Sequence, residues 1–243
     1  MPFLYETHMH TCQGSRCGKN TAVEMARAAK AAGYAGIMIT EHNWGGNCGV
    51  DKTLPWETWV TQFAQGYYDA KAWGDENGLD VFWGYEAGFH GIDFLVYGVT
   101  PQWLMAHPEL RGADMALHHT TVRNAGGVVI HAHPFREASY IHAQIFCPEL
   151  VDGVEGINAA HSWSKRCDIK ETYNQKAIQY AKEHGLPITA GSDIHSVNLY
   201  GGGIATKHRL TSVRDYCDLI LGDGDYLLTN GKAWFDKQGN PLE

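Results

Sequence analysis

The sequence begins with two histidines at a spacing that could bind a metal ion. In the stretch YETHMHT, Tyr5–Thr11, a single residue separates His8 from His10, and a single residue also separates Glu6 from His8. Alternate side chains of a β-strand point to the same face. If the stretch is a strand, the acid and both imidazoles share a face, a combination that suits Zn²⁺, Mn²⁺ or Fe²⁺. Because Glu6 would lie deeper, we expect it to orient a histidine instead of binding metal.

More polar residues, most of them histidines and acids, follow where later β-rich runs end. They are Glu41 and His42, Glu86, His131 and His133, Asn158 and His161, and Asp193 and His195. In parallel α/β folds the carboxyl ends of the strands form the rim where sites are built. An open sheet would spread these residues along an edge, whereas a barrel brings them to one mouth. Their convergence therefore favours a barrel.

The segments that must position these residues alternate between strand-like and helix-like patterns. The expected strands are 3–10, 36–40, 81–85, 93–98, 126–133, 152–158 and 187–193. The expected helices are 21–33, opened by a Thr21–Glu24 capping box, 56–73, 111–124, 168–184 and 213–221. The alternation predicts a mostly parallel sheet covered by helices. We expect one domain over residues 1–243, with a turn-rich tail in which a small hairpin is expected.

The composition is that of an ordinary globular protein. Of 243 residues, 44% are apolar and 19% are charged, and the formal net charge is −8. These values argue against disorder and against non-specific nucleic-acid binding. No apolar run reaches the roughly 18 residues of a membrane span, and no signal peptide is recognisable, so a cytoplasmic location is expected. The six scattered cysteines are expected to be free thiols.

Five segments, in order, resemble motifs of the PHP (polymerase and histidinol phosphatase) family. They are ETHMHT, ITEHN, GYEAG, VIHAHPFR and AGSDIH, and they lie within residues 3–200. A His-x-His pair alone is a weak signal, but five ordered motifs are a strong one. The resemblance implies a distorted seven-stranded (β/α)7 barrel, similar to a TIM barrel, with two or three divalent ions at its mouth. It also implies phosphoester hydrolysis, as in histidinol-phosphate phosphatase.

The same resemblance implies a set of metal ligands. They are His8, His10, His42, Glu86, His133, Asp193 and His195. Glu86 would bridge two ions, and His42 and His195 would belong to a third position. Glu86 and Asp193 would also serve catalysis through the ions they hold. His195 or His161 could protonate the leaving group.

The sequence departs from the family pattern in two places. Asp93 stands where a fourth-strand histidine is usual, and its carboxylate could still bind an ion. Beyond the histidine pair, TCQGSRCGK has Ser15 and Arg16 where an acid or histidine often completes the third site. Cys17 or Glu41 could substitute, or the third ion could be weakly bound or absent.

Each of several other residues near the motifs could have either of two roles. Arg136 could bind a phosphate oxygen bidentately or form a surface salt bridge. His161 could reach the pocket or lie in a solvated loop. Trp44, Trp56 and Trp59 could wall a substrate pocket, although packing is the commoner role of such residues.

We therefore predict a metal-dependent phosphoesterase in which a metal-activated water hydrolyses a small phosphomonoester. One alternative is an amidohydrolase-like enzyme acting on a C–N or C–O bond. In such barrels a modified lysine often bridges the metals, whereas Glu86 takes that place here. The other alternative is a non-catalytic PHP module that binds metal and a partner. The sequence leaves the substrate, the metal and the oligomeric state open.

Overall fold

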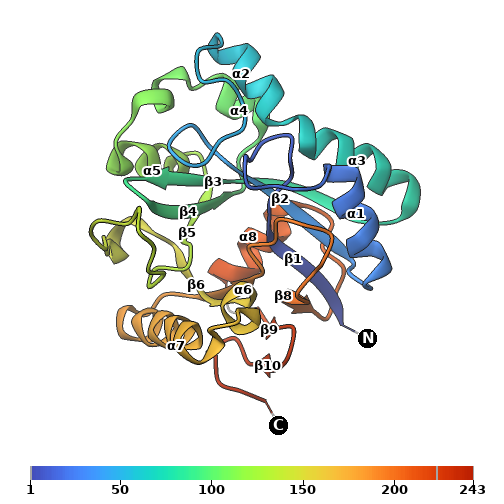
Figure 1. Cartoon of the computed structure of the whole chain (residues 1–243), viewed down its shortest axis with the longest axis vertical. Coiled ribbons are helices and arrows are strands. Elements are labelled where there is room, and N and C mark those ends of the chain that lie inside the picture. The colour runs from blue at the N-terminus through green and yellow to red at the C-terminus, as the bar shows by residue number, and fades with distance from the viewer. Residues whose placement is uncertain (1, 223, 243) are drawn as a thin grey trace.

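A computed structural model describes residues 2–222 and 224–242. The strands of these residues form one curled, mixed sheet in the order β10-β9-β8-β1-β2-β3-β4-β5-β6-β7 (Figure 1). The strands are β1 (Phe3–Met9), β2 (Gly36–His42), β3 (Asp80–Phe89), β4 (Ile92–Tyr97), β5 (Val128–His131), β6 (Gly153–Asn158), β7 (Ile188–Gly191), β8 (Gly202–Thr206), β9 (Tyr226–Asn230) and β10 (Trp234–Phe235). All seven predicted strands are present, and β1 to β7 follow one another across the sheet.

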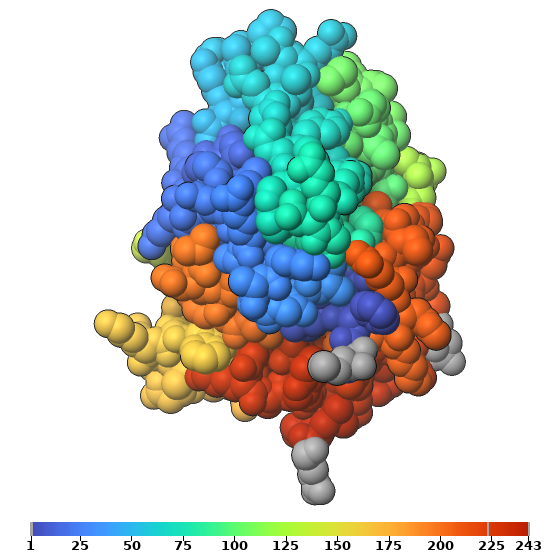
Figure 2. Space-filling view, turned by 90° about the vertical axis from the view of Figure 1, so that its right-hand side faces the viewer, coloured from blue at the N-terminus to red at the C-terminus, as the bar shows by residue number. Residues whose placement is uncertain are grey.

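Helices cover the sheet from outside. They are α1 (Ala22–Ala31), α2 (Trp56–Phe63), α3 (Gln65–Asn77), α4 (Pro101–Met105), α5 (Met115–Asn124), α6 (Ala159–Trp163), α7 (Cys167–His184) and α8 (Val213–Leu221). The predicted capping box opens α1, and Gly185 ends α7 in the left-handed conformation. Figure 2 shows α1 and α3 packed together above the C-terminal strands. No helix of the described residues has the length and apolarity that crossing a membrane requires.

The sheet differs from a regular β/α repeat at β4. The predicted parallel pairing holds for β1–β2–β3 and for β5–β6–β7, but β4 is antiparallel to both of its neighbours. Only His90 and Gly91 separate β3 from β4, and both have positive φ, 53° and 88°. Two such residues form a hairpin turn and are too few for the crossover that parallel strands need.

Because the sheet curls, the chain just after β7 lies beside the end of β1, although the two strands are far apart in the strand order. Just after β7, Ile194 forms a parallel bridge with Met9. The amide of His10 donates to the carbonyl of Ile194 at 2.9 Å, and the amide of Ile194 donates to the carbonyl of His8 at 3.1 Å. The chain beyond β7 therefore lies directly beside the end of β1. The predicted tail hairpin is also present, as the antiparallel pair β9–β10.

Candidate metal centre

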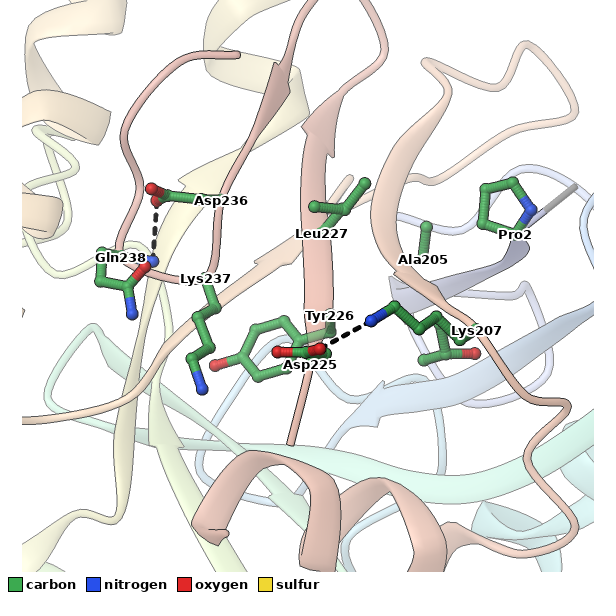
Figure 3. A pocket seen from close by; sticks show the side chains of 10 residues that line it. Pro2, Ala205, Lys207, Asp225, Tyr226, Leu227, Asp236, Lys237 and Gln238 are labelled. Atoms are coloured by element: carbon green, nitrogen blue, oxygen red, sulfur yellow. Dashed lines mark hydrogen bonds and ion pairs between the residues drawn. The ribbon is translucent and has the colours of Figure 1, made fainter. Parts of the chain in front are cut away.

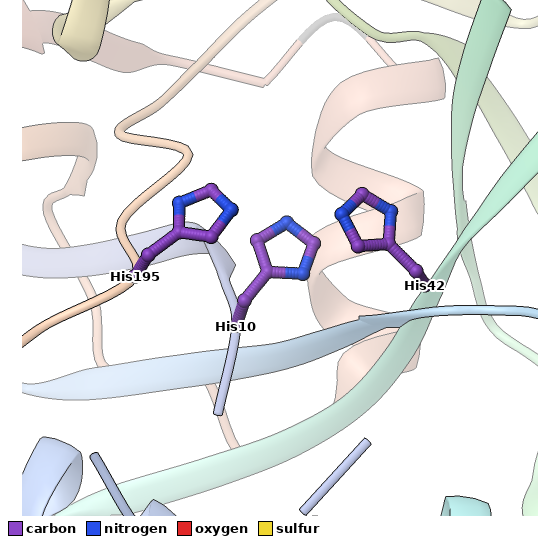
Figure 4. Close-up of side chains that lie close together, drawn as sticks. All are labelled: His10, His42 and His195. Carbon is purple, nitrogen blue, oxygen red and sulfur yellow. The ribbon is translucent and has the colours of Figure 1, made fainter. Parts of the chain in front are cut away.

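The candidate ligands meet at the rim where β1, β2 and β3 end. Figure 4 shows His10 between His42 and His195. The ring centroid of His10 is 4.3 Å from that of His42 and 4.6 Å from that of His195. As predicted, His8 and His10 share a face, and their Nε2 atoms are 3.1 Å apart. Because β4 is antiparallel, its first residues lie at this same rim, and Asp93 pairs with Gly88 near the end of β3. The antiparallel strand thus contributes its beginning where its neighbours contribute their ends.

Glu86 lies at the centre of the cluster. Its Oε2 is 2.7 Å from His42 Nδ1 and 3.3 Å from His10 Nε2. Its Oε1 is 3.1 Å from His133 Nε2 and 3.3 Å from His8 Nε2. One buried carboxylate therefore faces four imidazoles, an arrangement that suits a carboxylate shared by two ions.

Asp193 forms a second acidic centre beside the first. Its Oδ1 is 3.3 Å from His10 Nε2, 3.5 Å from His8 Nε2 and 3.7 Å from His195 Nε2. Its other oxygen pairs with the guanidinium of Arg136. Asp193 has a φ of 53°, a sparsely populated backbone conformation for a residue with a side chain. Such strain is often found at functional sites.

The polar atoms at the centre lack partners that a cation would supply. His42 Nδ1, Glu86 Oε2 and Asp193 Oδ1 are buried and make no hydrogen bond of regular geometry, although the first two atoms are 2.7 Å apart. Buried polar atoms without partners are costly, and a divalent ion would satisfy all three. Among the residues that the structure describes, four sets of side chains have ligand atoms within 4.8 Å of one another. They are His10/His42/His195, His8/Glu86/His133, His8/His10/Asp193 and His42/Glu86/Asp93. The residues therefore fit divalent ions.

The charges of the cluster also suit metal binding. Burial opposes ionisation of Glu86, but His42 and His8 outweigh it and hold its pKa well below the usual range. For Asp193, Arg136 and His8 likewise outweigh burial and lower the pKa. Burial and the neighbouring His42 lower the pKa of His10, which favours the neutral, ligand-competent imidazole.

Some predicted residues lie apart from these sets. Glu41 accepts hydrogen bonds from the Thr11 amide at 3.1 Å and the Ser15 hydroxyl at 2.5 Å, and it belongs to none of the four sets. His161 is buried, and its Nδ1 lies 3.1 Å from Asn174 Oδ1. Burial, helped by Arg136, lowers the pKa of His161 to about 3. A histidine that is neutral near pH 7 does not suit a proton donor.

A cavity of about 430 Å³ opens onto the ligands. The residues at its wall that bear on the chemistry are Cys17, His42, Asp93, Arg136, Asp193 and His195. A second cavity, of about 360 Å³, lies over β8 and β9 beside the Lys207–Asp225 ion pair (Figure 3). The described residues lining that second cavity include no histidine or cysteine, so the chemistry belongs to the first cavity.

The three tryptophans considered for a pocket wall pack against each other instead. Trp56 and Trp59 are stacked with centroids 5.5 Å apart, and Trp44 meets Trp56 edge-on at 5.1 Å. They belong to an apolar cluster outside the metal centre, and none lines the cavity.

Sequence reasoning missed Glu155, which lies within β6 and is fully buried. Its Oε1 is 2.8 Å from His8 Nδ1, and its Oε2 accepts from the amide of His133 at 3.2 Å. Gly191 leaves the necessary space, since a Cβ there would lie 2.6 Å from His8 Cβ and 2.7 Å from Glu155 Oε1. A single acid inside an otherwise apolar strand was the signal available in the sequence.

The position predicted for Glu6 is correct, but its partners differ. Glu6 Oε1 accepts from the backbone amides of His8 at 3.0 Å and Ser192 at 2.9 Å. Glu6 thus ties the end of β1 to the chain after β7, whereas Glu155 is the acid that holds the ring of His8.

We expect Glu155→Gln to weaken metal binding by about 10–100-fold, the usual cost of losing a group that orients a ligand. Without the carboxylate, the ring of His8 loses the partner at its Nδ1. Competition with a metal-sensitive chelator measures the affinity, and Glu149→Gln, at an exposed position, is the control. An unchanged affinity would mean that His8 keeps its orientation without Glu155.

Comparisons with known proteins agree with the fold. A PHP-associated family model matches residues 171–199, which include Asp193 and His195. A two-domain protein from Bacteroides vulgatus, containing a predicted PHP-like metal-dependent phosphoesterase, superposes with a TM-score of 0.68 at 15% identity. That alignment covers 94% of this chain, which spans only 65% of the two-domain protein.

Two further structures share the fold. A protein from Bifidobacterium adolescentis, provisionally named a metal-dependent phosphoesterase, has a TM-score of 0.53 at 16% identity, covering 90% of this chain and 96% of its own. An amidohydrolase from Chromobacterium violaceum, with bound sulfate and no metal, has a TM-score of 0.51 at 17% identity, covering 79% and 87%. No curated protein matches the chain significantly in sequence. The PHP-associated model therefore matches one segment of this chain, the one that holds Asp193 and His195, and the solved structures show that the chain shares their fold.

Proposed function

We propose that the protein is a metal-dependent phosphoesterase that hydrolyses a small phosphomonoester. The observation that carries the proposal is the convergence of three buried atoms that make no regular hydrogen bond, His42 Nδ1, Glu86 Oε2 and Asp193 Oδ1, beside a cavity whose wall holds Arg136. The ions would be held by His8, His10, His42, Glu86, His133, Asp193 and His195, with Asp93 as a further ligand. When bound, such ions lower the pKa of water and stabilise charge on phosphoryl oxygens.

Arg136 is the residue proposed to bind the substrate. Its guanidinium pairs with Asp193, which fixes its position, and it lines the cavity with its side chain 22% exposed. A guanidinium keeps its charge at any relevant pH and matches two phosphoryl oxygens at once. Arg136 would therefore orient the phosphoryl group against the buried cluster.

His195 lies at the mouth of the site, with its side chain 28% exposed. Its Nδ1 lies 2.8 Å from the carbonyl of Asp193, which leaves Nε2 directed toward the set of His10 and His42. We assign His195 to a metal position and not to proton transfer, because one imidazole nitrogen cannot do both.

Phosphoester hydrolysis is favoured over the amidohydrolase alternative by the central residue. Glu86, a carboxylate, stands where a modified lysine bridges metals in many amidohydrolases, and the described residues lining the cavity include no lysine. The likeness to the Chromobacterium violaceum amidohydrolase extends to the fold alone. The net charge of −8 favours a small phosphorylated substrate over nucleic acid.

The proposal is tested by metal analysis and a phosphate-release screen on one preparation. We expect bound Zn²⁺, Mn²⁺ or Fe²⁺ and hydrolysis of at least one small phosphomonoester, with activity lost on chelation and restored on reloading. A metal-loaded protein that hydrolyses C–N or C–O substrates and no phosphoester would favour the amidohydrolase alternative. A loaded protein inactive on both panels would favour a binding module.

We expect Arg136→Lys to lower kcat/KM about 10–100-fold while leaving the metal content unchanged. A hydrogen bond to a charged group is worth about 1.5–3 kcal/mol, and lysine cannot reproduce the bidentate pair. Arg209→Lys, at an exposed ion pair with Asp80, is the matched control. Equal kcat/KM in both variants would remove Arg136 from the proposed site.

A further inference from the structure

The loop between β1 and α1 brings a cysteine to the metal centre. Cys17 lines the same cavity as His42 and His195 and is only partly buried. Cys17 thus borders the same cavity as two imidazoles of the set of His10, His42 and His195, a set that does not itself include the cysteine.

Two hydrogen bonds fix this loop to the two histidines. Two residues before Cys17, the Ser15 hydroxyl accepts from the amide of His42 at 3.0 Å. Two residues after it, the amide of Lys19 donates to the carbonyl of His195 at 2.8 Å. Cys17 is therefore anchored on one side to His42 and on the other to His195.

The neighbours of Cys17 exclude other candidates in the loop. The Ser15 hydroxyl is already engaged by Glu41 at 2.5 Å, and Arg16 is exposed. At Gly18 a Cβ would lie 2.3 Å from the carbonyl of Thr11, so the turn immediately after Cys17 requires glycine. Of the side chains at 15–17, only that of Cys17 lines the cavity.

An acceptor in the same cavity independently indicates a cation. Asp193 Oδ1 has no hydrogen-bond partner, and its side chain is 5% exposed. It lies 3.7 Å from His195 Nε2.

We propose that Cys17 is a thiolate ligand of an ion held also by His42 and His195. This inference rests on the metal-dependent function proposed above, and it identifies the chemistry of one metal position. Two imidazoles and a thiolate form a soft ligand set that suits Zn²⁺ and disfavours Mg²⁺ and Mn²⁺, which prefer oxygen ligands. The position would therefore differ in metal preference from the carboxylate-rich sets around Glu86.

Cobalt provides a probe that does not depend on enzyme activity. We expect the purified chain loaded with Co²⁺ to show a sulfur-to-cobalt charge-transfer band in the near ultraviolet, which oxygen and nitrogen ligands alone do not give. Cys17→Ser should remove the band and weaken binding of one ion by at least roughly 100-fold, above the 10–100-fold typical of groups that only orient ligands. Cys12→Ser, at an exposed cysteine of the same loop, should change neither.

Two further measurements keep the test decisive if Cys17→Ser fails to fold. Cys17→Asp should keep the ion, lose the charge-transfer band and shift preference from Zn²⁺ toward Mn²⁺. In the wild-type chain, Zn²⁺ should shield Cys17 but not Cys12 from alkylation by iodoacetamide, located by peptide mass spectrometry.

A wild-type Co²⁺ spectrum without the band, a band that survives in Cys17→Ser, or equal alkylation of both cysteines with Zn²⁺ would overturn the proposal. Phosphate release is assayed separately on the same samples. A Cys17-dependent band in a protein inactive on all phosphoesters would support the thiolate ligand and contradict the phosphoesterase. Phosphoesterase activity without such a band would support the phosphoesterase and contradict the thiolate ligand.

Discussion

Glu86→Gln is expected to abolish tight binding of the central ions and to lower turnover by at least about 1,000-fold. The carboxylate faces four imidazoles at 2.7–3.3 Å, so its loss affects four candidate ligands at once. Glutamine has one neutral oxygen, and its amide would present N–H groups to nitrogens that must stay free for metal. Removing even one electrostatic donor from an active site costs about 10²–10³ in kcat.

The measurement is metal content after dialysis, followed by phosphate release on the best substrate of the screen. Glu76→Gln, on the exposed surface of α3, controls for loss of a negative charge. Circular dichroism establishes that the variant is folded. Full metal content with wild-type turnover in Glu86→Gln would contradict the central role given to this residue.

Much of the candidate site was accessible from the sequence, because strand alternation and the order of the elements are local properties. His8 and His10 share a face since they are two residues apart on a strand, and that geometry needs no tertiary information. His42 ends β2 and Glu86 lies three residues before the end of β3, and parallel pairing of these strands places the two residues opposite each other.

The residues that sequence reasoning missed depend on contacts between distant segments. Glu155 is separated from His8 by 147 positions, and only the curled sheet makes them partners. The direction of β4 depends on the two-residue turn at His90 and Gly91. The positive φ values that make this turn a hairpin are properties of the folded chain and are not visible in the sequence. The sequence predicts Asp93 at the start of a strand. Because β4 runs antiparallel to β3, the beginning of β4 lies at the rim where β3 ends.

The loop after the histidine pair illustrates the same limit. Ser15 and Arg16 occupy the position where a third-site ligand is expected, and Cys17 and Glu41 are the candidates that could substitute for it. Their spacing along the chain does not distinguish them, since a loop has no fixed period of side-chain direction. The distinction comes from hydrogen bonds to His42 and His195, which lie 27 and 176 residues from the Ser15 and Lys19 that they engage.

Glu6→Gln is expected to change how stability depends on pH. Burial raises the pKa of Glu6 from its ordinary 4.5 to about 7, although the amides of Ser192 and His8 partly oppose the rise. A tenfold change in proton affinity is worth about 1.4 kcal/mol, so the shift corresponds to roughly 3 kcal/mol. Because the folded state binds the proton more tightly, this contribution is fully present below pH 4.5 and is lost as pH rises through about 7. Glutamine does not titrate and removes that loss.

Urea denaturation of the chelated wild type and variant at pH 5 and pH 8 measures the effect. Chelation keeps ion binding at the neighbouring His8 out of the comparison. Relative to wild type, Glu6→Gln should gain stability between these pH values by an amount approaching the roughly 3 kcal/mol above. Glu24→Gln should show no such change between pH 5 and pH 8, because hydrogen bonds from Thr21 lower the pKa of Glu24 from 4.5, so their stabilisation is lost only at lower pH. If the difference between Glu6→Gln and wild type were the same at both pH values, Glu6 would not carry a raised pKa, and its hydrogen bonds to the two backbone amides would outweigh its burial.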